Sequence, residues 1–180
     1  MEQERNLLLN NSMIYGLIMG TYWVVKYIFF IGSVSYPSAS FIYWGMTLSV
    51  PFLLYSLMKH FRISTKRPVG FMELWRMGVL IFFFSALIVS LAHFVFYRFL
   101  APPDLIVNSM EFAKNIIDGS QLSSEVKESF RSVGTPTPIL MTLQGIVNNV
   151  IGGIFISIPI AAIVSRKGLN TPFEKNTNKE

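Results

Sequence analysis

Residues 77–99 read MGVLIFFFSALIVSLAHFVFYRF and contain no acidic residue. A helix needs about 20 mostly apolar residues to cross the hydrocarbon core of a membrane, which is about 30 Å thick. This stretch is too long and too evenly apolar to form one face of a soluble helix. It therefore predicts a membrane-spanning helix.

Three other stretches meet the same requirement, and they are residues 12–31, 40–58 and 139–164. All 10 acidic residues fall between or outside the four stretches. Charged residues make up only 14% of the chain, whereas an ordinary soluble domain has about 25%. The first stretch begins without a positive charge and exceeds the apolar core of a signal peptide, so we expect it to be retained. We therefore expect an all-α, polytopic membrane protein with four transmembrane helices in a single domain over residues 1–168.

The distribution of lysine and arginine predicts the orientation, because cytoplasmic loops carry an excess of these residues. Ten of them lie before the first stretch, between the second and third stretches, or after the fourth, and these segments share one side of the membrane. They are Arg5, Lys59, Arg62, Lys66, Arg67, Arg76, Arg166, Lys167, Lys175 and Lys179. Only three lie in the opposite loop of residues 100–138, at Lys114, Lys127 and Arg131. We therefore expect a multi-pass membrane protein, with both termini in the cytoplasm and the loop of residues 100–138 outside.

This outer loop predicts a short amphipathic helix. Between residues 104 and 118, apolar residues fall on one helical face and polar residues on the other, as in helices that lie in a membrane interface. Pro102 and Pro103 favour a helix start there, and a second short helical piece is expected after Ser124. Residues 169–180 are polar, and we expect them to form a disordered cytoplasmic tail.

Three basic or ionisable residues lie in or at the predicted spans, all toward the outer side, and they are Lys26, His93 and Arg98. A charge at the centre of a spanning helix costs about 2.5–3.5 kcal/mol on insertion scales, so such residues are candidates for function. Lys26 lies about five residues from the outer end of its span, and a lysine stem can extend most of that distance. It can thus be an interfacial anchor, a ligand-contacting residue or part of a structural polar pair. The three residues together can line a cationic outer vestibule, or they can be unrelated.

The fourth span carries amides and a stripe of small residues. The most polar cluster inside any span consists of Gln144, Asn148 and Asn149. Small residues recur at multiples of four along this helix, and the first span has a matching pair: Gly145, Gly153 and Ser157, with Gly16 and Gly20. Small residues let helix backbones approach closely in lipid, and amides can hydrogen-bond across helices. We favour helix–helix packing for both features, with a polar substrate path along the amides as the alternative.

Motifs that carry catalytic chemistry are missing from the sequence. It has no G-x-S-x-G, P-loop, dinucleotide-binding glycine fingerprint or H-E-x-x-H motif. The absence of cysteine excludes disulfides, thiolate metal sites and iron–sulfur clusters. No architecture for stacking bases or reading phosphates is visible. We therefore expect no enzymatic activity, no cofactor, no metal site and no nucleic-acid partner.

Several sequence segments carry a resemblance to a known family. They are YGLIMG at residues 15–20, GFMELW at 70–75 after the basic loop, FLAPPDL at 99–105, and the last span, which opens at Pro138-Ile139 and runs from IAAIV at 160–164 into Arg166-Lys167. Through these segments, residues 6–168 resemble a domain-of-unknown-function family of small bacterial membrane proteins, common in Bacteroides-related bacteria. The resemblance implies the four-span topology and carries no activity or site residues.

Binding is the function that these observations favour. We expect a non-enzymatic inner-membrane protein that binds a protein partner, membrane lipid or another copy of itself through its bundle and outer loop. The alternative is a small transporter or channel subunit, whose polar path in the outer leaflet involves Lys26, His93 and the amides of the fourth span. Polar side chains that cluster inward favour a path, whereas scattered or lipid-edge positions favour packing and anchoring.

Overall fold

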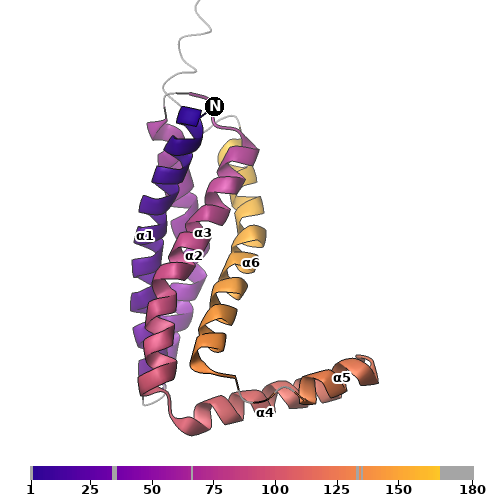
Figure 1. Ribbon diagram of the computed structural model, residues 1–180. Helices are drawn as coiled ribbons and strands as arrows, with labels where there is room; N and C mark the ends of the chain where they lie inside the picture. The colour runs from indigo at the N-terminus through magenta and orange to yellow at the C-terminus, as the bar shows by residue number, and fades with distance from the viewer. Residues whose placement is uncertain (1, 34–35, 66, 133, 135, 167–180) are drawn as a thin grey trace, which may run out of the picture. The chain divides into compact units, whose positions relative to one another are not determined.

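The computed structural model describes residues 2–33, 36–65, 67–132, 134 and 136–166, and within these ranges it contains helices and no strand. Four helical segments are long and apolar enough to cross a membrane. They are α1 (Glu2–Ser33), α2 (Ala39–Ser64), α3 (Phe71–Val95) with the π-helical turn η1 (Phe96–Leu100), and α6 (Pro138–Ser165). Two shorter helices, α4 (Pro103–Gly119) and α5 (Ser124–Arg131), precede α6 (Figure 1). The predicted all-α fold with four potential spans is confirmed.

Each long helix extends beyond the apolar stretch that predicted it. α1 has 32 residues and α6 has 28, whereas about 20 residues cover the hydrocarbon core. The membrane with its headgroup regions is about 40–45 Å thick, which corresponds to about 27–30 residues at 1.5 Å per residue. Hydropathy therefore identifies the apolar section of each helix, and the ends continue into polar sequence.

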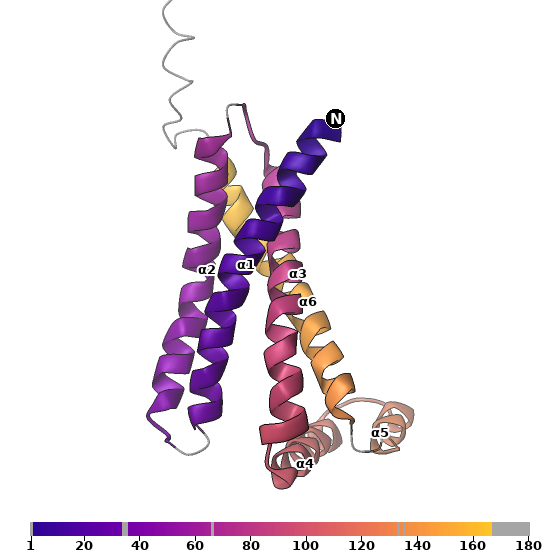
Figure 2. The same ribbon diagram turned by 60° about the vertical axis from the view of Figure 1, so that its left-hand side comes forward.

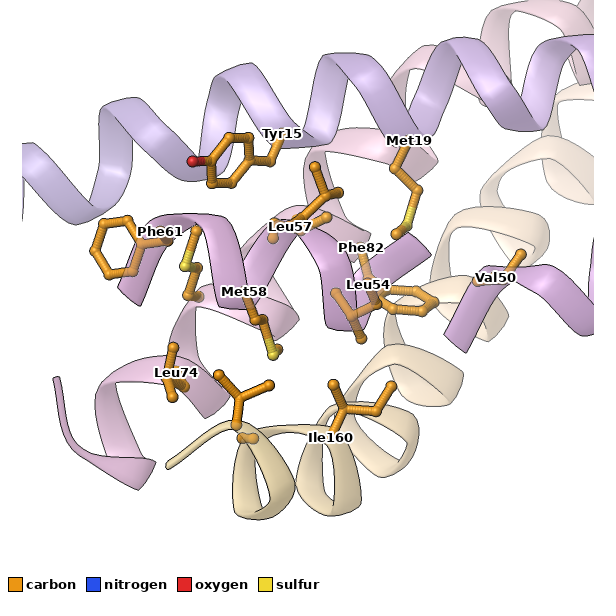
Figure 3. Packing of buried hydrophobic residues seen from close by; sticks show 14 of the residues in the cluster. Tyr15, Met19, Val50, Leu54, Leu57, Met58, Phe61, Leu74, Phe82 and Ile160 are labelled. Atoms are coloured by element: carbon orange, nitrogen blue, oxygen red, sulfur yellow. The ribbon is translucent and has the colours of Figure 1, made fainter. Parts of the chain in front are cut away.

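One compact unit comprises the described residues up to 89 and those from 146 onward. In it α1, α2, most of α3 and most of α6 pack around a continuous apolar core, and the two views of the fold show α1 and α2 side by side (Figures 1 and 2). All four helices contribute fully or nearly fully buried side chains (Figure 3), among them Met19, Leu54, Met58, Phe61, Leu74, Met77, Ile81, Phe82, Ala161 and Val164.

A second unit spans residues 90–145 and holds the end of α3, η1, α4, α5 and the start of α6. Pro103 is the first residue of α4, as a helix start allows. Two cations of α5 meet the last turn of α4: Arg131 forms an ion pair with Asp118 at 3.0 Å, and Lys127 Nζ donates to the Asp118 carbonyl at 2.9 Å. Positive charge is favourable at a helix C-terminus.

Both expected helices of the loop are therefore present, at Pro103–Gly119 and Ser124–Arg131. The structure does not test the expectation for the tail, because residues 169–180 lie outside the described residues.

Candidate functional site

Two glycines of α1 bring this helix close to α3. A Cβ atom placed on Gly16 would lie 2.5 Å from Cβ of Phe84, and one on Gly20 would lie 2.9 Å from Cβ of Ile88. Ser85 adds a polar contact, since its Oγ lies 3.0 Å from the Gly16 carbonyl oxygen and donates to it. There is no room for a side chain on either glycine, so small residues set the separation of α1 and α3.

The contact between α3 and α6 is built in the same way. A Cβ atom on Gly153 of α6 would overlap the Phe82 side chain of α3. Ser157, one turn further along α6, is fully buried and faces Gly78 of α3, where a Cβ atom would collide with it. Gly78 does not appear among the residues that the sequence singles out, because it belongs to no stripe of small residues at four-residue spacing.

An apolar groove lies beside the contact of α1 with α3. Its volume is about 400 Å³, and its lining consists of Met13, Ile14, Leu17, Phe84, Leu87 and Ile88. Phe84 and Ile88 also face the two glycines of α1, so the groove borders the tightest part of the contact. No local sequence pattern predicts the groove, because its lining comes from two helices that are distant in the sequence.

Lys26 lies on α1, half-buried in an aromatic environment. Its Nζ is 5.8 Å from the ring centre of Trp23 and 5.2 Å from that of Tyr43 on α2. Such distances fit cation–π attraction. Sequence proximity points to Trp23, but Tyr43 comes from the next span and could not be found from the pattern around Lys26.

His93, Arg98 and Gly145 all lie in the second unit, whereas Lys26 lies in the four-helix unit. Nδ1 of His93 is 3.2 Å from the position that a Cβ atom on Gly145 would take, so these residues of α3 and α6 are in contact. Arg98 is exposed, with its guanidinium 5.7 Å from the ring centre of Phe99. The structure thus brings His93 and Gly145 together.

The three amides of α6 differ in exposure. Gln144 and Asn148 are exposed, and Asn149 is half-buried. Gln144 belongs to the second unit and the two asparagines to the four-helix unit. Within the described part of each unit, the amides therefore do not form a buried cluster.

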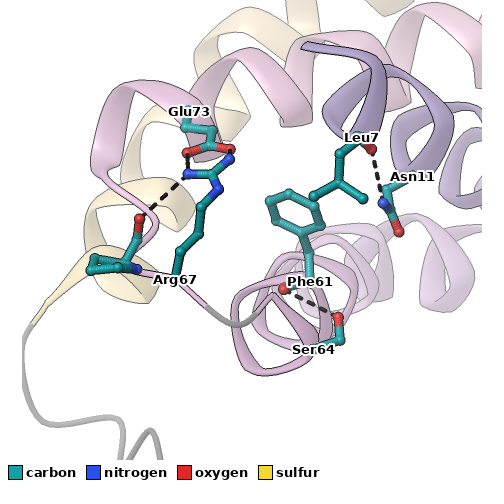
Figure 4. Close-up of polar contacts among 7 residues, drawn as sticks. Leu7, Asn11, Phe61, Ser64, Arg67 and Glu73 are labelled. Atoms are coloured by element: carbon teal, nitrogen blue, oxygen red, sulfur yellow. Dashed lines mark hydrogen bonds and ion pairs between the residues drawn. The ribbon is translucent and has the colours of Figure 1, made fainter. Parts of the chain in front are cut away.

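Two arginines form hydrogen bonds and an ion pair at one end of the four-helix unit, where α1 begins, α2 ends, α3 begins and α6 ends (Figure 1). Arg62 donates to the carbonyl of Val164, in the last turn of α6, and at 3.0 Å to that of Arg166, the residue after this helix. Arg67 forms a two-pronged ion pair with Glu73, with N–O distances of 2.9 and 2.5 Å (Figure 4). The sequence indicates these arginines only as determinants of orientation.

Two titratable side chains meet near the same end. The Tyr15 hydroxyl and His60 Nδ1 are 2.7 Å apart and share a hydrogen bond between α1 and α2. The two residues are distant in sequence, so their pairing depends on how the helices pack. Among the described residues, no group of three histidines or acids is placed to hold a metal ion.

Comparison with known families gives a match over most of the chain. The family model described as "Protein of unknown function (DUF4199)" matches residues 14–166, from the first potential span to the end of the last. No curated protein and no solved structure matches. The resemblance to a family of unknown function is thus confirmed, and the chain belongs to the DUF4199 family.

Proposed function

We propose that the protein acts by binding within the membrane, and that it neither catalyses a reaction nor conducts a solute. One observation carries this proposal, namely the chemistry of the interior. Among the described residues, the buried polar side chains other than aromatic ones are small hydroxyls, at Ser12, Ser85, Thr142 and Ser157. A path for an ion or a polar solute needs polar or charged groups that face it, whereas the core of the four-helix unit is apolar.

The positions of the other candidates support binding as well. Lys26 contacts two aromatic rings, which is the environment of an interfacial anchor. Gln144 and Asn148 are exposed, which favours packing and anchoring over an inward polar path. The binding partners we propose are therefore membrane lipid, another membrane protein or a second copy of the chain.

We place the protein in the inner membrane of a bacterium, with the arginine-rich end in the cytoplasm. Arg62, Arg67 and Arg76 lie where α2 ends and α3 begins, and loops rich in arginine and lysine stay on the cytoplasmic side. In this orientation α4 and α5, which follow the other end of α3 in the chain, are extracytoplasmic.

Single cysteines test the orientation without background, because the chain contains none. In spheroplasts, a membrane-impermeant maleimide is expected to label Lys114→Cys and to leave Lys66→Cys unlabelled until the membrane is opened. Labelling of Lys66→Cys together with protection of Lys114→Cys would reverse the orientation.

Two measurements on the full chain test binding against conduction. The protein is extracted from native membranes into polymer nanodiscs, and the lipids and proteins that accompany it are identified. Specific lipids or proteins are expected to be enriched relative to nanodiscs of an unrelated four-span protein. Purified protein in vesicles is expected to leave ion and solute flux at the level of protein-free vesicles. Flux above that level, abolished by Lys26→Gln or His93→Gln, would replace our proposal with the transporter alternative.

A further inference from the structure

The groove between α1 and α3 has the chemistry of a site for a lipid chain. Every residue that lines it is apolar. Its rim is open to the surroundings, since Ile14 and Leu17 of α1 are 56% and 57% exposed and Leu87 of α3 is 42% exposed. Leu87 lies near the middle of its potential span, and Ile14 and Leu17 lie in the first half of theirs. At that depth, the groove is open either to acyl chains or to the apolar face of another helix.

Arg76 lies on the same face of α3 as Leu87 of the groove, toward the arginine-rich end. It precedes Leu87 by about three helical turns, or about 16 Å along the helix axis. Half of a hydrocarbon core is about 15 Å. A phosphate held by Arg76 would therefore lie at the membrane interface, and the chain below it would reach the groove.

Arg76 differs from Arg62 and Arg67, the two arginines that immediately precede it at this end. Arg62 is bonded to backbone carbonyls of α6, and Arg67 is paired with Glu73. Arg76 is exposed and takes part in no hydrogen bond or ion pair within the described part of the chain. Its charge is thus available to an anion from outside the protein.

We propose that the α1–α3 groove and Arg76 bind one anionic phospholipid from the leaflet at the arginine-rich end. The acyl chain occupies the groove, and the phosphate pairs with the guanidinium. This inference rests on the proposed binding function and names its ligand. Charge complementarity favours a lipid, because an anionic headgroup supplies a negative charge at the membrane interface, and Glu73, the acid close to Arg76 in the sequence, is paired with Arg67.

The test uses the purified full chain in detergent, titrated with phosphatidylglycerol or with phosphatidylcholine of the same acyl chains. The midpoint of thermal unfolding reports binding, because a ligand of the folded state raises it. We expect apparent affinity for phosphatidylglycerol to be about fivefold higher, as one arginine near anionic headgroups provides. Equal affinity for the two lipids would overturn the proposal.

Two pairs of variants separate the headgroup site from the groove. Arg76→Gln is expected to remove the preference for phosphatidylglycerol, whereas Lys59→Gln at the same end is expected to keep it. Leu17→Trp fills the groove and is expected to lower the affinity for both lipids about equally. Leu48→Trp, on an exposed face of α2, is expected to leave both affinities unchanged. A preference that survives Arg76→Gln, or affinities that survive Leu17→Trp, would overturn the site.

A third measurement asks whether a second copy fills the groove instead. Leu17→Cys and Leu87→Cys are expected to remain monomeric when oxidised in native membranes. Disulfide-linked dimers through both positions would overturn the lipid site and leave the proposed binding function intact. Solute flux through vesicles would instead overturn the proposed function, so the two failures are distinguishable.

Discussion

Two apolar helix faces of the four-helix unit differ sharply in how far they are buried. The face of α3 that carries Phe82 and Ile81 is buried against neighbouring helices, whereas the face of α2 that carries Leu48 and Phe52 leaves each of them 73% exposed. Hydrophobicity does not explain the difference, since lipid chains are as apolar as leucine. What α3 has and this face of α2 lacks is a set of small residues opposite large ones. Burial here follows complementary size.

The largest expected effect comes from a pair of adjacent glycines on α6. A Cβ atom on Gly153 would overlap Phe82, whereas one on Gly152 would meet nothing within 4 Å. Gly153→Leu is therefore expected to lower the free energy of unfolding by about 1–3 kcal/mol, the range for overpacked cores. Denaturation by sodium dodecyl sulfate in mixed micelles measures it.

Gly152→Leu is the matched control, with the same change one residue away. It is expected to leave the free energy of unfolding unchanged or slightly higher, because leucine forms helix better than glycine. Equal losses from the two variants would show that any added bulk on α6 is harmful, and the size argument for the α3–α6 contact would fail.

A smaller change probes the contact of α1 with α3. Gly16→Ala places its methyl group 2.5 Å from Cβ of Phe84, so the two helices must separate slightly. We expect a loss of about 1 kcal/mol of unfolding free energy, at the low end of overpacking. Gly45→Ala on α2 meets nothing within 4 Å and is expected to cost nothing. Were Gly16→Ala as stable as Gly45→Ala, glycine would not be what sets this contact.

Sequence patterns predict those features that depend on one helix at a time. Membrane thickness sets the length of an apolar stretch, so all four spans and the helix at Pro103–Gly119 follow from local patterns. Partners across helices depend on how each helix is rotated, which is set by packing. The pairing of Tyr15 with His60 and the contact of Lys26 with Tyr43 are therefore invisible in the sequence. Gly78 is visible in the sequence as a glycine within a span, but its contact with Ser157 is not, because it belongs to no stripe of small residues.

Ser85 tests how much of the α1–α3 contact is polar. Its hydroxyl hydrogen is shared between the carbonyls of Gly16, at 3.0 Å, and Ile81, at 2.6 Å. Only the first bond joins two helices. Ser85→Ala is expected to lower the free energy of unfolding by about 0.6 kcal/mol, the average for hydrogen bonds between spanning helices. A loss as large as that of Gly153→Leu would mean that hydrogen bonding, and not size, holds this face of α3.

The smallest effect is expected at Lys26, the one charge well inside a predicted span. Lys26→Gln removes cation–π attraction to Trp23 and Tyr43, which is worth about 0.5–1 kcal/mol at exposed sites. It also removes the cost of holding a charge in the apolar region, which has the opposite sign and a similar size near the interface. The two terms offset, so the free energy of unfolding is expected to change by less than about 0.5 kcal/mol, with normal expression. If the variant kept its stability but lost lipid or partner binding, Lys26 would be a ligand contact, and its aromatic surroundings would then serve the ligand.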